Sequence, residues 1–267
     1  MAKDRSMRLL GLIGVALALV VSGCVTTTDS RFTREADRDK ALENYVKLAT
    51  AYIGQGNLNR AEHHLNRALE IDSDYAPALA AQGLVYSSDG ETELAEKSFR
   101  QALSHDSGYT RGRTYYGAFL YSQRRFEEAR NQFSVASRDT KYEDRGSVFF
   151  NLGMTEERLD NLEAAEAAFR RSVELTRGEP RSLLALSRVL VDLEDYSAAS
   201  RYYSRLQRVI GGSTRHRHSP ESLLTGIKIA RHFGDQDQEA SMALMLRNEF
   251  PESVEYQQYK VLIANER

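Results

Sequence analysis

The sequence predicts an all-α protein made of repeated helical hairpins, and three observations lead to this fold class. The 267 residues include only four prolines and no tryptophan, and 41% of them are hydrophobic, so the chain can form a continuous helical core. Ala61, Ala95 and Ala129 follow one another at intervals of 34 residues. A large apolar residue stands four positions after each of these alanines, on the same helix face.

The first element along the chain is a predicted signal peptide over residues 1–23. Lys3, Arg5 and Arg8 give it a positive start, and an uncharged apolar run follows over residues 9–21. A membrane-spanning helix needs about 20 apolar residues, so the short run favours a cleaved signal over an uncleaved membrane anchor.

The segment Val21-Ser22-Gly23-Cys24, which ends the apolar run, resembles the bacterial lipobox. The resemblance implies that the chain is cut before Cys24 and that this cysteine is acylated. The acyl chains would anchor the protein stably, because each buried CH₂ group contributes about 0.8 kcal/mol. Val25 stands where an inner-membrane retention signal carries aspartate, so the resemblance also implies the outer membrane, with the protein body on the periplasmic face.

A polar segment without an apolar period follows the cysteine, and we expect residues 24–39 to form a flexible, lipidated tether. The folded domain is predicted over residues 40–267. The formal net charge of the chain is −2, and its basic residues are interspersed with acids, so the composition does not favour nucleic acid as a partner.

The folded domain carries a register of four columns, in which small or large residues recur at the same positions of successive units. Self-similarity at 34 residues is the period of the tetratricopeptide (TPR) repeat, a hairpin of two helices. Small residues let the two helices approach closely, and large ones fill the space between hairpins. The small residues of the first helices are Ala49, Gly83, Gly117, Gly153 and Ser187; the second helices carry Ala61, Ala95, Ala129, Ala165 and Ala199, then Leu65, Phe99, Phe133, Phe169 and Tyr203, then Ala68, Ala102, Ala136, Ser172 and Leu206.

This register predicts a right-handed TPR superhelix of six hairpins plus a C-terminal helix. An ordinary helix bundle is the alternative, but a bundle has no reason to keep a 34-residue register. Short insertions interrupt the register near Asp144 and over 214–219, and residues 254–267 are expected to cap the stack. The expected units are approximately 42–75, 76–109, 110–143, 146–179, 180–213 and 220–253.

No residue pattern suited to catalysis stands out, so we expect no enzyme activity, cofactor or metal. Phosphate-binding, dinucleotide-binding and zinc-protease motifs are absent from the sequence, and a lone cysteine cannot form an intrachain disulfide. His63 and His64 are expected on an exposed helix face, where adjacent residues point in different directions. His216 and His218 could hold a metal ion in a metal-dependent enzyme, but the neighbouring arginines would repel a cation.

The first helices of a TPR stack line a groove, and the register indicates which residues face it. The set is largely apolar at its N-terminal end, which fits a partner segment with apolar side chains, although any single position could instead belong to the core. The TPR clamp that grips terminal carboxylates with lysine and asparagine is not matched, since only Arg111 keeps a basic residue. The expected groove residues are Val46, Thr50, Ile53, Ala80, Leu84, Ser87, Thr114, Ala118 and Tyr121, followed by Phe150, Met154, Glu157, Leu184, Arg188 and Val191.

Several stretches resemble the type IV pilus biogenesis lipoproteins of the PilF or PilW family, and the resemblance extends over the lipobox and all six units. These stretches are Arg38-Asp39-Lys40-Ala41 leading into Tyr45, Tyr116-Gly117-Ala118-Phe119-Leu120-Tyr121, Phe149-Phe150-Asn151-Leu152-Gly153, residues 223–230 and residues 250–257.

The resemblance implies a pilotin, which is an outer-membrane lipoprotein that binds the secretin PilQ and promotes its outer-membrane localisation and multimerisation. It also implies that partner binding lies in the groove of the early repeats. We expect a monomer held to the membrane by its lipid. The alternative is a general periplasmic TPR scaffold for envelope or cell-wall assembly.

Overall fold

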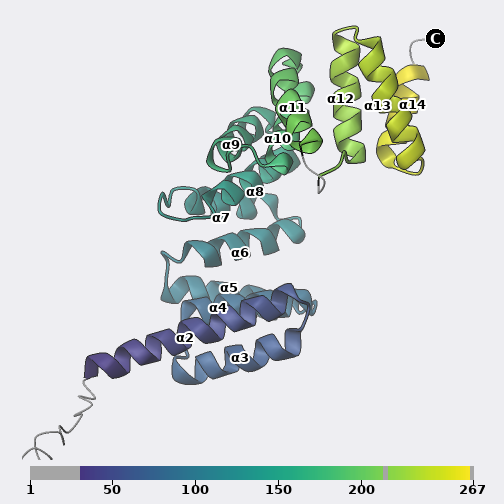
Figure 1. Cartoon of the computed structure of the whole chain (residues 1–267). Helices are drawn as coiled ribbons and strands as arrows, with labels where there is room; N and C mark the ends of the chain where they lie inside the picture. Colours follow the sequence, from purple (N-terminus) through teal and green to yellow (C-terminus); the bar gives the residue numbers. More distant parts are fainter. Residues whose placement is uncertain (1–30, 213–215, 265–267) are drawn as a thin grey trace, which may run out of the picture. The chain divides into compact units, whose positions relative to one another are not determined.

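The computed structural model describes residues 31–212 and 216–264, and every element in these ranges is a helix (Figure 1). Helix α2 has 24 residues, and the described helices that follow it have 11–16 residues each. The helices are α2 (Arg31–Gly54), α3 (Leu58–Ile71), α4 (Ala76–Ser88), α5 (Thr92–His105), α6 (Thr110–Ser122), α7 (Phe126–Ala136), α8 (Arg145–Arg158), α9 (Leu162–Leu175), α10 (Pro180–Asp192), α11 (Tyr196–Gly211), α12 (Pro220–His232), α13 (Gln236–Glu249) and α14 (Val254–Ala264).

Helix α2 begins nine residues before the predicted start of the folded domain. Residues 31–39, expected to be part of a flexible tether, are helical. This stretch contains neither proline nor glycine, and its Arg, Glu and Ala residues favour helix, so nothing in it stops α2 from extending toward the N-terminus. The boundary between two compact units falls within α2, after Asn44, and the second unit runs from Tyr45 onward.

Helices in the second unit pack as consecutive hairpins. The closest pairs are α4 with α5, α6 with α7, α8 with α9, α10 with α11, and α12 with α13, and the last helix of one hairpin contacts the first helix of the next. Helix α14 packs on α12 and α13. Contacts confined to neighbouring elements are the hallmark of a solenoid, so the prediction of an all-α TPR stack is confirmed.

In the core of each central hairpin, a glycine of the first helix contacts an aromatic ring of the second helix. A Cβ atom added to Gly83 would lie 2.7 Å from the Phe99 ring, and one added to Gly117 would lie 2.8 Å from the Phe133 ring. Both rings are completely buried. The small column and the large column of the register therefore face each other, and glycine is required because any side chain would occupy the place of the ring.

The turn inside each of the six hairpins contains one residue with positive φ, at the same position of the register. Three of these residues are glycines and three are not, although a left-handed conformation costs other residues about 1–2 kcal/mol. The turn after α6 shows why the conformation is kept: the N–H groups of Arg124 and Arg125 donate to the carbonyls of Tyr121 and Leu120 at 3.0 and 2.9 Å, closing the helix end. The six residues are Gly56, Gly90, Arg124, Asp160, Glu194 and Gly234.

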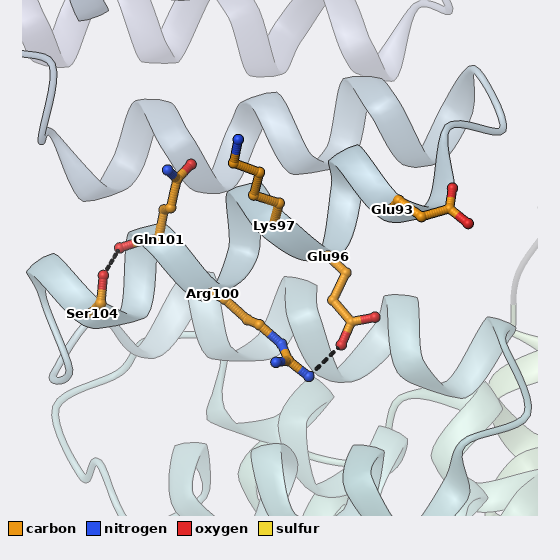
Figure 2. Close-up of a pocket in the computed structure, with 6 residues that line it drawn as sticks. All are labelled: Glu93, Glu96, Lys97, Arg100, Gln101 and Ser104. Atoms are coloured by element: carbon orange, nitrogen blue, oxygen red, sulfur yellow. Dashed lines mark hydrogen bonds and ion pairs between the residues drawn. The ribbon is translucent and has the colours of Figure 1, made fainter.

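Glu96 on α5 links the second hairpin to the third. Its carboxylate accepts two hydrogen bonds from Arg125, at 2.7 and 3.0 Å, and one from the Tyr116 hydroxyl at 3.0 Å. Arg100 pairs with the same carboxylate at 2.7 Å (Figure 2). The hydrogen bonds from Arg125, together with those from Tyr116 and Arg100, lower the pKa of Glu96 to about 2.

We predict that Gly117→Ala lowers the free energy of unfolding by about 1–3 kcal/mol, because the new methyl group overlaps the buried Phe133 ring. Urea denaturation followed by circular dichroism measures the loss. Gly54→Ala is the matched control, since a Cβ at Gly54 has no atom within 4 Å. Equal effects of the two substitutions would contradict the packing argument.

We predict that Glu96→Gln lowers the free energy of unfolding by about 1–2 kcal/mol at neutral pH, because an amide cannot replace a carboxylate bound by Arg125. The folded-state pKa is depressed, so this stabilisation is present above the ordinary pKa of 4.5 and is lost as the pH falls toward about 2. Denaturation across this pH range should show the two proteins converging.

Glu93→Gln provides the control on the same helix, because Glu93 is exposed and has no ion-pair partner among the described residues. A difference between wild type and Glu96→Gln that stayed constant down to pH 2 would show that the carboxylate is not the source of the stabilisation.

Candidate partner-binding site

The predicted groove residues differ in how much surface they expose. Val46, Thr50 and Ile53 on α2 are half-buried, as are Leu84 and Ser87 on α4 and Tyr121 on α6, whereas Ala118 on α6 is exposed. Ala80 is fully buried and Thr114 is 9% exposed.

Ala80 and Thr114 are therefore core residues, and a partner cannot use them as contact surface. Ala80 packs with Leu79 and Ala102, and Tyr109 covers the same cluster. The hydroxyl of Thr114 donates to the Thr110 carbonyl at 3.0 Å. Close approach of α4 and α6 explains both, since it removes the space that a groove needs.

An apolar hollow lies farther along the stack, and we call it the apolar pocket. It has a volume of about 210 Å³ and is formed by α6, α7 and α8. A volume of this size accepts one large apolar side chain. Its lining residues are Ala118, Tyr121, Phe133, Phe150, Asn151 and Met154.

The shape of the apolar pocket follows from one small residue between large ones. Ala118 is exposed and leaves a gap between the half-buried side chains of Tyr121 and Phe150. Both aromatic rings are held by neighbours: Tyr121 contacts Phe126 edge-on with centroids 5.3 Å apart, and Phe150 lies 5.7 Å from Phe169. The walls are therefore fixed before any partner arrives, which reduces the entropic cost of binding.

Asn151 adds one polar group to this pocket. Its amide side chain has no hydrogen-bond partner among the described residues, while its backbone carbonyl accepts a bond from Thr155 within α8. An amide presents one acceptor and two donors, so it can pair with the N–H and C=O groups of another chain.

The first helices of the later repeats carry charges that neutralise one another. Arg188 on α10 pairs with Glu157 on α8 at 2.7 Å and with Glu221 on α12 at 2.8 Å. Lys228 lies 3.9 Å from Asp192. Burial raises the pKa of Glu157 although Arg188 opposes the shift. These charges link α8, α10 and α12. Most of them line a second hollow of about 210 Å³, so the apolar pocket is the hollow suited to an apolar side chain.

Comparison with known proteins agrees with the fold of the stack. The tetratricopeptide repeat profile matches residues 42–75, 76–108 and 117–180. The type IV pilus assembly protein PilF of Pseudomonas aeruginosa (strain PAO1) is 37% identical over 245 residues, which cover 91% of this chain and 95% of that protein. The chain belongs to the PilF family of type IV pilus assembly proteins.

Solved structures support the family at the level of the fold. A structure of Pseudomonas aeruginosa PilF matches with a TM-score of 0.76 and 36% identity, over 84% of this chain and 99% of that one. The structure of PilW, a type IV pilus biogenesis factor, matches with a TM-score of 0.68 over 82% of this chain and 97% of that one, and its 24% identity shows similarity of the fold.

A larger hollow of this PilF-family chain lies along α5, with a volume of about 640 Å³ (Figure 2). All of its lining residues belong to that one helix, and Figure 2 shows Lys97 and Glu93 pointing away from each other. Glu96 and Arg100, which also line it, take part in the ion-pair network described above. The hollow is therefore an open charged surface whose central groups serve the stack, and it is a weaker candidate than the apolar pocket.

Two of the histidines singled out in the sequence, His64 and His218, take structural positions. His63 is exposed, but His64 is half-buried and stacks on Tyr52 with ring centroids 5.5 Å apart, so the expected exposed face was wrong for His64. His218 places Nδ1 2.9 Å from the Ser222 hydroxyl. Within residues 31–212 and 216–264, three or more potential metal ligands do not gather at any point.

The lipid anchor lies outside the described residues, because Cys24 precedes residue 31. In the described part of the chain, none of the helices combines the length and the apolar character needed to cross a membrane.

The register placed Phe150 and Met154 on the groove face but did not predict the apolar pocket. It missed Asn151, which follows Phe150 directly, and Phe133, whose ring forms part of the pocket lining although it is buried against Gly117. The exposed Ala118 was the available signal, since a small residue between larger ones on a groove face marks a potential hollow.

Proposed function

We propose that this protein is a pilotin, an outer-membrane lipoprotein that takes part in type IV pilus assembly by binding the pilus secretin and promoting its localisation and multimerisation. Membership of the PilF family carries the proposal, because 37% identity extends over nearly all of both chains. The TPR stack supports a role in holding another protein rather than in catalysis.

The apolar pocket is the proposed point of contact with the secretin. Burying one large apolar side chain there contributes about 1.5–3 kcal/mol, which is enough to anchor a segment whose remaining contacts are weak. The half-buried residues of the earlier first helices would extend the contact, as the family resemblance implies. These residues are Val46, Thr50, Ile53, Leu84 and Ser87.

Cys24 is the proposed site of lipidation, and Val25 favours sorting to the outer membrane with the stack on the periplasmic side. A lipid anchor suits a pilotin, because a protein fixed to the outer membrane can deliver its partner there. A general periplasmic TPR scaffold is the competing function, and it predicts a different set of partners.

We predict that Cys24→Ser moves the protein out of the outer-membrane fraction and reduces secretin multimers there, because the unlipidated protein cannot be retained. Fractionation with immunoblotting of both proteins measures this, and a deletion strain complemented with the wild-type chain is the reference. Normal secretin multimers in the deletion strain would reject the pilotin function, and co-purified cell-wall enzymes without secretin would favour the scaffold.

We predict that Ala118→Phe weakens secretin binding about tenfold or more, because the new ring fills the apolar pocket from an exposed position. Affinity measured with the purified secretin checks this, and circular dichroism checks that the helices persist. Ala240→Phe on α13 is the matched control, since Ala240 is also an exposed helical alanine. Unchanged binding by Ala118→Phe would place the contact elsewhere on the stack.

A further inference from the structure

The start of α10 and the residues just before α12 form a basic cluster that the proposed function does not use. Arg181, His216 and Arg217 border a hollow of about 100 Å³, and none of the lining residues in the described part of the chain is acidic. The other lining residues are Pro180, Leu184, Leu206, Ile210, Ser219 and Ser222.

Arg181 connects this hollow with the apolar pocket. Its guanidinium lies 4.7 Å from the centroid of the Phe150 ring, which lines the apolar pocket, and it also lines the basic hollow. One nitrogen donates to the Ser147 hydroxyl at 2.9 Å, and Nε pairs with Glu179 at 3.0 Å. The guanidinium is therefore held in place between the two hollows while about half of the side chain remains exposed.

Glu179 offsets the charge of Arg181, so Arg217 supplies the positive charge of this hollow that has no ion-pair partner among the described residues. Arg217 is exposed, and it precedes α12, where the Ser219 hydroxyl accepts a hydrogen bond from the Ser222 N–H at 3.1 Å. The partial positive charge of the α12 N-terminus adds to the field of Arg217, and Glu221 in the first turn of α12 is itself paired with Arg188. The basic hollow therefore favours an anionic group next to the apolar pocket.

We infer that the partner segment is an extended, acidic stretch with one large apolar side chain. The apolar side chain enters the apolar pocket, and a carboxylate a few residues along the segment pairs with Arg181 and Arg217. Arginine suits this role, because its planar fork matches the geometry of a carboxylate. The inference rests on the proposed function and deepens it, since it states the chemistry of the secretin segment.

The extended conformation follows from Asn151. Its unpartnered amide can pair with a peptide group only if that group is free, and the peptide groups inside a helix are already hydrogen-bonded to one another. A basic segment would be repelled by the two arginines, and a phosphate group on a lipid would occupy the basic hollow but leave the apolar pocket empty.

Two labelled ten-residue peptides test the inference against the purified full-length chain in detergent. Each contains one phenylalanine, and the flanking charged residues are aspartate in one peptide and lysine in the other. We expect the aspartate peptide to bind at least about tenfold more tightly by fluorescence anisotropy. Arg181→Glu with Arg217→Glu should abolish this preference, whereas Arg201→Glu, an exposed arginine of α11, should preserve it.

Three outcomes would overturn the inference: equal affinity for the two peptides, a preference that survives the double reversal, or an equal loss with Arg201→Glu. If the double reversal instead released the chain from phosphatidylglycerol vesicles and left both peptide affinities unchanged, the basic cluster would belong to a membrane surface. Recovery of the secretin on the purified chain is scored separately. Secretin recovery without an aspartate preference rejects only the inference, and an aspartate preference without secretin rejects the proposed function.

Discussion

The geometry of the stack depends on one close contact inside each central hairpin. In this contact a glycine of the first helix meets an aromatic ring of the second helix. At Gly153 the Phe169 ring comes so near that an added Cβ would lie 2.6 Å from it. The two helices can approach this closely because one of them lacks a side chain at the crossing point, and the buried ring then fills the interior on the other side. Repeating the contact in each central unit keeps these first helices in a regular order, and the candidate site lies on the face that they share.

The candidate site arises from variation on this constant frame. The rings in the core are fixed, so a small residue on the outer side of a first helix leaves a hollow that the neighbours cannot close. Ala118 does this between Tyr121 and Phe150, and the buried Phe133 ring contributes to the lining. On the later helices the same face carries Arg188 between Glu157 and Glu221, and these charges bind one repeat to the next beside a second, polar hollow. The same face thus carries the candidate site on α6 and α8 and ion pairs between repeats farther along the stack.

The fold could be predicted from the sequence because the residues of the register recur at a fixed spacing along the chain. Columns such as Gly117 and Phe133 can be counted directly, and each reports a contact within its own hairpin. The positive-φ position in each turn was not predicted, since Arg124 and Glu194 carry no sequence sign of a left-handed conformation.

The site was less accessible to sequence reasoning, because it depends on contacts between units. Ala80 faces the groove side by its register but is buried, since neighbouring first helices close over it. Asn151 gains its role only from the hollow that Ala118 opens on the neighbouring helix. The burial of a residue and the presence of a hollow depend on the volumes of side chains from two neighbouring helices. The periodicity of one segment does not report these volumes.

The turns inside the hairpins also bear on how such a chain can diverge over time. Their backbone conformation is the same in every unit, yet glycine fills it at Gly56 and charged residues fill it at Arg124 and Asp160. The backbone of these turns accepts arginine, aspartate and glutamate alike, and these residues are exposed to solvent. Substitutions there can change the surface charge while the stack stays intact. Lineages could therefore vary the electrostatic character of one border of the molecule by single substitutions, independently of the core and of the candidate site.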